Sequence, residues 1–260
     1  MADRYTYLAS IGLFFIPAIL ARELGLRWAG IRTLIIGLAI LTVTACAWRT
    51  RVQVACWKNT EALFLHAMDV TTDNIVACNK LGSFYANHGR VAEAMKYYDI
   101  ALKINPDDPD VLYDLGNACA QQGDWDSAIT HYRHALRFNP NQADVLNNLG
   151  LALAAKRQFA EAIGCFQTSL QLDATSADTH NNFAAVLFRE HRFDEAVQQY
   201  REALRITPDD PRIYANLGDA LVRLGKANEA VPCYQSALRL DPGNAAVEKR
   251  LRALNNPAAN

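Results

Sequence analysis

The sequence has almost no net charge, because 26 lysines and arginines stand against 27 aspartates and glutamates in 260 residues. A chain with this balance and 51% hydrophobic residues is neither a disordered polyanion nor a basic nucleic-acid binder, so we expect no nucleic-acid partner. The balance conceals two unlike regions. Residues 1–58 carry seven basic side chains and two acidic ones, whereas residues 59–260 carry nineteen and twenty-five.

Groups of residues that carry catalysis or bind metals are also missing. The glycines are scattered singly, which excludes a phosphate-binding loop. His131 and His134 lie three residues apart on an expected helix, but no third ligand follows at a partner spacing, which favours surface histidines over a metal pair. The six cysteines show no paired spacing, which favours buried thiols over a disulfide framework. We therefore expect no enzyme activity, no metal and no cofactor.

The basic region holds two runs of sixteen uncharged residues, Tyr5–Leu20 and Thr33–Trp48. A membrane-spanning helix needs about 20 apolar residues, with about 17 as the usual lower limit, so both runs depend on their flanks. Arginines at the ends can snorkel to the membrane surface, and Trp28 and Trp48 would lie at interface depth. The pattern therefore favours membrane insertion of this region.

The two runs predict a transmembrane helical hairpin in residues 1–52, with spans at about 5–21 and 31–48. A signal peptide, a single span and two buried soluble helices are the alternatives. Arginines between the runs favour a cytoplasmic connection, whereas arginines after the second run favour the opposite orientation. Charge alone therefore leaves the orientation open.

From residue 75 onward the sequence repeats itself every 34 residues, and the five units begin at 75, 109, 143, 177 and 211. Position 20 of the unit is always alanine, position 8 is glycine in four units, and position 24 is always tyrosine or phenylalanine. The residues at position 8 are Gly82, Gly116, Gly150, Ala184 and Gly218, those at position 20 are Ala94, Ala128, Ala162, Ala196 and Ala230, and those at position 24 are Tyr98, Tyr132, Phe166, Tyr200 and Tyr234.

This periodicity predicts a helical hairpin in each unit. Small residues at positions 8 and 20 allow two antiparallel helices to approach closely, while the large residue at position 24 fills the gap beside them. Aspartate followed by proline, as at Asp108–Pro109 and Asp210–Pro211, is typical of a helix start. Pro232 falls inside the second helix of the fifth unit and should make it irregular. Because one unit cannot bury its apolar face alone, stacked units must share a core.

The repeats resemble the tetratricopeptide repeat family over residues 75–242. The resemblance implies an all-α fold, a right-handed α-solenoid of tetratricopeptide units. The predicted units are 75–108, 109–142, 143–176, 177–210 and 211–244, with a junction half-repeat at 53–74 and a capping helix and tail at 245–260. The third unit departs from the pattern at Arg157, where three other units have glycine.

The first helices of such arrays line a concave groove, and their position 6 is polar throughout. It reads Lys80, Asp114, Asn148, Asn182 and Asn216. A carboxamide can donate to and accept from a peptide backbone. The asparagines are similar to the ladder of the nucleocytoplasmic O-GlcNAc transferases, which implies that Asn148, Asn182 and Asn216 hold an extended peptide. The alternative is that asparagine is merely tolerated on an exposed helix face.

Position 2 of the same helices is acidic in three consecutive units, at Asp110, Asp144 and Asp178. The helix dipole favours aspartate in a first turn, which explains the row without any ligand. If the row faces the groove, it should prefer basic peptides. It also argues against a dicarboxylate clamp, which needs lysine or arginine where this chain has Asp114 and Asp144.

The amino-terminal motif Asp3-Arg4-Tyr5-Thr6-Tyr7-Leu8 resembles a late membrane segment of polytopic glycosyltransferases that end in tetratricopeptide repeats, such as the animal O-mannosyltransferases. Trp57, Leu63-Phe64 and Ala67 resemble the junction between membrane and repeats in that family. The resemblance implies the carboxy-terminal part of such a protein, or a relative without the catalytic acidic loop. It also implies repeats that face away from the cytoplasm.

The two regions together predict an integral membrane protein with extracytoplasmic repeats that bind an extended peptide or a partner protein in the groove. One alternative is a part of a membrane glycosyltransferase that presents the acceptor protein to a catalytic domain. The other is a structural scaffold for a membrane complex.

Overall fold

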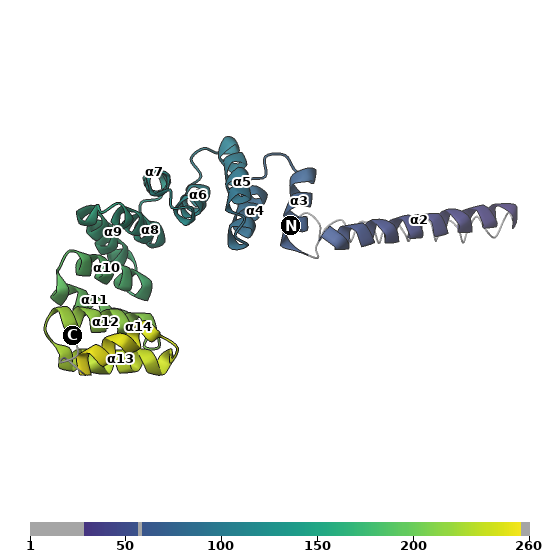
Figure 1. Ribbon diagram of the computed structural model, residues 1–260. Coiled ribbons are helices and arrows are strands. Elements are labelled where there is room, and N and C mark those ends of the chain that lie inside the picture. Colours follow the sequence, from purple (N-terminus) through teal and green to yellow (C-terminus); the bar gives the residue numbers. More distant parts are fainter. Residues whose placement is uncertain (1–28, 57–58, 256–260) are drawn as a thin grey trace. The chain divides into compact units, whose positions relative to one another are not determined.

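The computed structural model describes residues 29–56 and 59–255, and the regular elements in these ranges are all α-helices (Figure 1). The chain divides into two compact units, Met1–Val70 and Thr71–Asn260. The first unit contains α2 (Ala29–Cys56) and α3 (Thr60–Val70).

Helix α2 includes the second of the two predicted membrane spans. Within residues 29–56 and 59–255, no helix is both long and apolar enough to cross a membrane. The uncharged run that ends at Trp48 has sixteen residues, below the usual minimum of about 17, and Arg49 and Arg51 continue the same helix. This finding corrects the predicted transmembrane hairpin, and with it the predicted integral-membrane localisation with extracytoplasmic repeats.

Some sequence predictions concern residues that the structure does not describe. The first predicted span at about 5–21, the motif at residues 3–8 and Trp57 of the junction all lie outside the described residues.

The second unit consists of helix pairs that follow the 34-residue period. The first helices are α4 (Ile75–Asn87), α6 (Pro109–Gln121), α8 (Ala143–Ala155), α10 (Ala177–Arg189) and α12 (Pro211–Arg223). The second helices are α5 (Val91–Ile104), α7 (Trp125–Phe138), α9 (Phe159–Leu172), α11 (Phe193–Ile206) and α13 (Ala227–Leu240). Helix α14 (Ala245–Asn255) begins one period after α12. The all-α helical-hairpin array predicted from the repeat is confirmed.

Capping aspartates begin two of the first helices, as the sequence predicts. The side chain of Asp108 accepts from the backbone amides of Asp110 and Val111, both at 3.2 Å, with proline as the first helical residue. Asp210 accepts from the amide of Arg212 at 2.8 Å in the same way. These bonds satisfy amides that have no partner within the helix.

Helix α13 runs without interruption from Ala227 to Leu240 with Pro232 inside it, so the proline does not end the helix. Proline removes one backbone donor, which in a regular helix bonds to the carbonyl four residues earlier. Pro232 is exposed and lies in the second turn, so the helix absorbs the loss of one hydrogen bond near its start.

The interior of each hairpin is built from three repeat positions, 8, 20 and 24, which we name the spine. The five alanines at position 20 are each 0% exposed. A Cβ atom added at Gly116 would lie 2.6 Å from Cε1 of Tyr132, and one at Gly218 would lie 2.6 Å from Cε1 of Tyr234. The aromatic ring therefore lies directly over the glycine, rather than in a gap beside it as the sequence predicted.

The turn between the two helices of each unit places one residue in the left-handed region. Three units use glycine there, at φ of 74° to 78°. Arg157 and His191 take the same conformation in the third and fourth units, at φ of 62° and 61°. A side chain in this region costs roughly 1–2 kcal/mol, so these two turns carry backbone strain that the glycine turns avoid.

The helix pairs of the second unit follow one another along an arc, with α4, α6 and α8 toward its inner side (Figure 1). Each second helix contacts the first helices before and after it, and consecutive first helices also contact one another. Because neighbouring units approach most closely on the inner side of an arc, these contacts also place the first helices there.

Candidate functional site

The inner side of the array presents one face of each first helix. Positions 2, 6, 9 and 13 are spaced by four, three and four residues, so they lie on the same helical face. We name this face the inner stripe. Its members in the five units are Val76, Lys80, Ser83 and Asn87; Asp110, Asp114, Asn117 and Gln121; Asp144, Asn148, Leu151 and Ala155; Asp178, Asn182, Ala185 and Arg189; and Arg212, Asn216, Asp219 and Arg223. All twenty side chains are exposed or half-buried.

The predicted asparagines connect neighbouring units. Asn182 donates from Nδ2 to Oδ1 of Asn147 in the preceding unit at 3.1 Å. Asn216 donates in the same way to Oδ1 of Asn181 at 3.3 Å. Each carboxamide has two N–H groups and one oxygen, so one N–H of each is used between units. The oxygen and the second N–H have no bonds among the described residues.

Asn148 is more fully engaged than the other two asparagines. Its Nδ2 donates to Oδ1 of Asn117 at 2.9 Å and to the hydroxyl of Tyr113 at 3.1 Å, both in the preceding unit. Its Oδ1 accepts from Nδ2 of Asn147 at 3.1 Å. Asn148 therefore has fewer groups left for a ligand, which the sequence alone did not reveal.

Asp114 occupies position 6 of the second unit. It also bonds to the preceding unit, but through a carboxylate instead of a carboxamide. The Ser83 hydroxyl of the preceding unit donates to Oδ2 of Asp114 at 3.2 Å. Burial raises the pKa of the Asp114 carboxyl, while hydrogen bonds from Ser83 and Asn79 act in the opposite direction. Lys80, at the same position of the first unit, is exposed.

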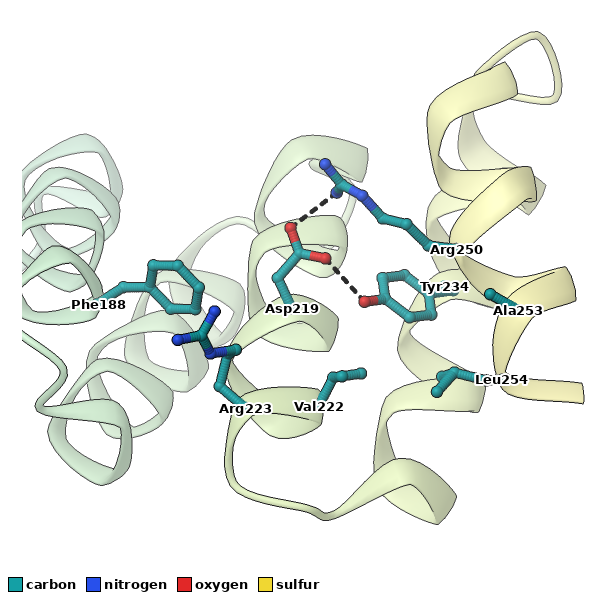
Figure 2. Close-up of a pocket in the computed structure, with 8 residues that line it drawn as sticks. All are labelled: Phe188, Asp219, Val222, Arg223, Tyr234, Arg250, Ala253 and Leu254. Atoms are coloured by element: carbon teal, nitrogen blue, oxygen red, sulfur yellow. Dashed lines mark hydrogen bonds and ion pairs between the residues drawn. The ribbon is translucent and has the colours of Figure 1, made fainter. Parts of the chain in front are cut away.

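The ladder of position-6 residues continues onto α14, where the sequence analysis missed it. Arg250 is the sixth residue of α14, and its Nη1 lies 2.7 Å from Oδ2 of Asp219 (Figure 2). The Tyr234 hydroxyl donates to Oδ1 of the same Asp219 at 2.7 Å. Extending the 34-residue count past residue 244 would have placed Arg250 in register, but the polar composition of this helix pointed only to a cap.

Position 9 of the stripe touches the spine, a connection that sequence reasoning also missed. The Tyr132 hydroxyl at position 24 donates to Oδ1 of Asn117 at position 9, at 2.7 Å. Tyr234 and Asp219 repeat this pairing in the fifth unit. In the third unit the aromatic residue is Phe166, which lacks a hydroxyl, and position 9 is apolar. Tyrosine at position 24 accompanies a polar position 9 in the first, second and fifth units, but the fourth unit combines Tyr200 with Ala185.

The acidic row at position 2 is open to solvent. Asp110, Asp144 and Asp178 are all exposed, and none of them forms a salt bridge with another described residue. Arg212, at position 2 of the fifth unit, is held by Asp210 at 2.7 Å. The three carboxylates are therefore open to solvent and free of salt bridges to the described residues.

The histidines and cysteines of the described repeats have ordinary structural surroundings. His134 contacts Asp107, with 3.1 Å between Nε2 and Oδ1. Among the described residues, no group of three or more potential ligands could hold a metal ion. Cys78 and Cys119 are buried, and burial raises the pKa of both thiols, which opposes formation of a reactive thiolate.

A pocket of about 330 Å³ lies at the end of the stripe, where α12, α13 and α14 meet (Figure 2). Its apolar walls come from Phe188, Val222 and Leu254. Its charged groups are Arg223 and the ion pair of Asp219 with Arg250.

Solved tetratricopeptide-repeat structures are similar to this chain in fold. YrrB, a tetratricopeptide-repeat protein with an unusual peptide-binding site, has a TM-score of 0.62 at 19% identity, over 75% of this chain and 100% of that one. MamA from Desulfovibrio magneticus RS-1 has a TM-score of 0.61 at 18% identity, over 66% and 98% of the two chains. A thermophilic tetratricopeptide-repeat protein from Thermus thermophilus has a TM-score of 0.56 at 22% identity, over 70% and 98%. These identities establish likeness of fold alone.

Human protein O-mannosyl-transferase TMTC1 is 29% identical to this chain over 117 residues. The match covers 44% of this chain and 13% of the length of that enzyme. It agrees with the predicted resemblance to glycosyltransferases that carry tetratricopeptide repeats.

The family of the cilia and flagella-associated protein 70 C-terminal domain matches residues 53–257, which include α3, all five helix pairs and α14. The match covers the described repeats from end to end and accords with their helical-hairpin architecture. The chain is a tetratricopeptide-repeat protein and belongs to the family of the cilia and flagella-associated protein 70 C-terminal domain.

Proposed function

We propose that the chain binds an extended segment of a partner protein along the inner stripe and performs no catalysis itself. The observation that carries the proposal is the row of half-buried carboxamides at position 6, which recurs once per unit at Asn148, Asn182 and Asn216. A peptide backbone presents one donor and one acceptor per residue, and a carboxamide is complementary to both.

The bonds between units support this role, because they orient the carboxamides before a ligand arrives. Asn182 and Asn216 each use one N–H on the preceding unit and keep an oxygen for a backbone amide. A side chain that is already fixed loses less conformational entropy on binding than a free one. YrrB, which is similar in fold, has a peptide-binding site, and this likeness lends further support.

The acidic row gives the proposed groove a preference. Asp110, Asp144 and Asp178 are exposed on the same face as the asparagines and form no salt bridge with another described residue. Opposite charges across an interface favour the correct partner and raise the rate of encounter. We therefore expect the bound segment to carry lysine or arginine opposite these aspartates.

The proposal can be tested with peptides selected on the full chain from a random displayed library. The triple variant Asn148→Ala, Asn182→Ala, Asn216→Ala should bind the selected peptide at least about tenfold more weakly, the equivalent of one or two lost hydrogen bonds. The measurement is fluorescence anisotropy of the labelled peptide, and circular dichroism verifies that the array stays folded.

A matched control separates recognition from stability. The double variant Asn147→Ala, Asn181→Ala removes the bonds that Asn182 and Asn216 make to the preceding units but leaves the predicted ligand-binding residues in place. It should keep most of the affinity. Unchanged binding by the triple variant, or an equal loss in both variants, would contradict the proposal.

A second candidate function is favoured by the match to O-mannosyl-transferase TMTC1. In this alternative the repeats present an acceptor protein to a glycosyltransferase domain, encoded upstream or on another chain. A tagged chain purified from its native cells should then bring down mannosyl-transfer activity. Recovery of partner proteins without transferase activity would contradict this alternative and leave the peptide-binding proposal intact.

A further inference from the structure

The inner stripe changes its charge along the array. Position 2 is acidic in the second, third and fourth units, at Asp110, Asp144 and Asp178. Position 13 is arginine in the fourth and fifth units, at Arg189 and Arg223. Positions 2 and 13 lie at opposite ends of each first helix, so the acidic and basic rows follow opposite edges of the face and overlap only in the fourth unit.

The basic end of the stripe coincides with the pocket of about 330 Å³ described above. Its two arginines differ in their surroundings. Arg250 is paired with Asp219 at 2.7 Å. Arg223 has no carboxylate partner in the part of the chain that the structure describes. The pocket therefore combines an apolar wall with one cation whose charge is not balanced nearby.

Aromatic contacts position Arg223. Its guanidinium carbon lies 5.2 Å from the centre of the Phe193 ring, and Phe193 contacts Phe188 edge to face with 5.3 Å between ring centres. Figure 2 shows the guanidinium beside the Phe188 ring. Stacking on aromatic faces restricts an arginine side chain while leaving its N–H donors available for a planar acceptor.

From this geometry we infer that the pocket receives an acidic side chain, aspartate or glutamate, with an apolar neighbour from the same partner segment. This inference rests on the proposed function and makes it more specific. The partner segment then has two charged parts, basic residues opposite the acidic row and a carboxylate opposite Arg223. The apolar neighbour packs against Phe188, Val222 and Leu254.

The charges favour a carboxylate over a phosphate. Two arginines and one aspartate line the pocket, which leaves one positive charge after Asp219 and Arg250 have paired. A singly charged carboxylate balances that charge and fits the two-pronged guanidinium geometry. A phosphate group carries a charge of about −1.5 to −2 at neutral pH, and its excess would face the Asp219 carboxylate.

The test uses the full chain and a random library of displayed peptides of about 12 residues, long enough at about 3.3 Å per extended residue to follow several units. Peptides selected on the wild-type chain should be enriched both in basic residues and in an acidic residue beside an apolar one. Selection on Arg223→Gln should lose the acidic enrichment and keep the basic one. The matched control is Arg239→Gln, which removes the same charge from the exposed face of a second helix.

A selected peptide is then synthesised with glutamate, glutamine or phosphoserine at the acidic position. For the wild-type chain the glutamine peptide should bind about tenfold more weakly, in the range of one charge-assisted hydrogen bond. For Arg223→Gln the glutamate and glutamine peptides should bind alike, and for Arg239→Gln the tenfold difference should persist.

The outcomes distinguish the inference from the proposed function. A selection that enriches no peptide contradicts the proposed function. Enrichment of basic residues without an acidic one contradicts only the inference. A preference for glutamate over glutamine that persists in Arg223→Gln also contradicts the inference. Tighter binding of the phosphoserine peptide than of the glutamate peptide contradicts the choice of a carboxylate.

Discussion

The spine and the inner stripe belong to the same repeat units, yet they differ in how much they vary between units. Position 20 of the spine is alanine in every unit, whereas position 6 of the stripe changes from lysine through aspartate to asparagine. Every unit packs its two helices against each other in the same way, so the spine must have the same shape five times. The side chains of the stripe are exposed or half-buried and have no such requirement. Its variation can therefore encode which partner is bound, while the spine determines the fold.

Substitutions at Gly116 and Gly164 should give the largest change in the free energy of unfolding. A methyl group on Gly116 would lie 2.6 Å from the Tyr132 ring, so Gly116→Ala should lower the free energy of unfolding by about 1–3 kcal/mol. Gly164 has no atom within 4 Å of an added Cβ, and Gly164→Ala should raise the free energy by about 0.5–1 kcal/mol. Urea unfolding followed by circular dichroism measures both. Effects of the same sign would show that helix propensity outweighs packing in the spine.

The contact between position 24 of the spine and position 9 of the stripe is tested by giving the third unit the residues that the second unit has at these two positions. Phe166→Tyr places a hydroxyl next to Leu151, which offers it no hydrogen bond, and should lower the free energy of unfolding by about 1 kcal/mol, a modest loss because Leu151 is partly open to solvent. Adding Leu151→Asn should restore most of this loss, because it recreates the pair seen in Tyr132 and Asn117. A double-mutant cycle from the same unfolding experiment gives the coupling. Simple additivity of the two changes would mean that the pairs are independent.

The turn between the two helices of each unit has one residue in the left-handed conformation in all units, but the identity of this residue differs between units. Arg157→Gly should stabilise the array by about 1 kcal/mol, because glycine adopts the left-handed conformation without the cost that a side chain incurs. The reverse change Gly123→Arg should destabilise it by a similar amount. Thermal unfolding of both variants is the measurement, and a loss of stability in Arg157→Gly would indicate that the arginine side chain makes a compensating contact.

Asp114 gives the smallest expected effect and the only one that depends on pH. Burial raises the pKa of this carboxyl, so the folded state disfavours the ionised form. The resulting destabilisation is absent below the ordinary aspartate pKa of about 3.9 and is fully present once the pH exceeds the raised value. Asp114→Asn should therefore stabilise the array at pH 7 by less than about 1 kcal/mol, with the gain shrinking toward pH 3.5. A gain that does not change with pH would assign the effect to packing.

The repeat spacing in the sequence was enough to predict the helix pairs, because close packing imposes the same small and large residues in each unit. The capping at Asp108 and Asp210 followed from local chemistry alone. The position of the Tyr132 ring over Gly116 did not follow, since it depends on how the two helices are aligned along their length. The prediction of a membrane hairpin was wrong because each apolar run reaches the minimum length of a membrane span only if its flanking residues are counted.

The candidate site was predictable in position but not in chemistry. The 34-residue spacing placed Asn182 and Asn216 on one face, and the structure adds that each is already bonded to the preceding unit. Those bonds connect residues 35 apart, so they depend on the rotation between units rather than on the sequence of either one. Arg223 was overlooked because its significance arises from Phe193 and Phe188, which come from different helices.

The bonds between units also make the array extensible. Asn216 pairs with Asn181 in the same way that Asn182 pairs with Asn147, so the fourth unit can follow itself. A duplicate of residues 177–210 inserted after residue 210 would place its own position-6 asparagine against Asn181. The array would gain one helix pair of the same length and keep the same fold. Under the proposed function, the number of units then sets the length of the partner segment that the array can bind, and this length grows by whole repeats.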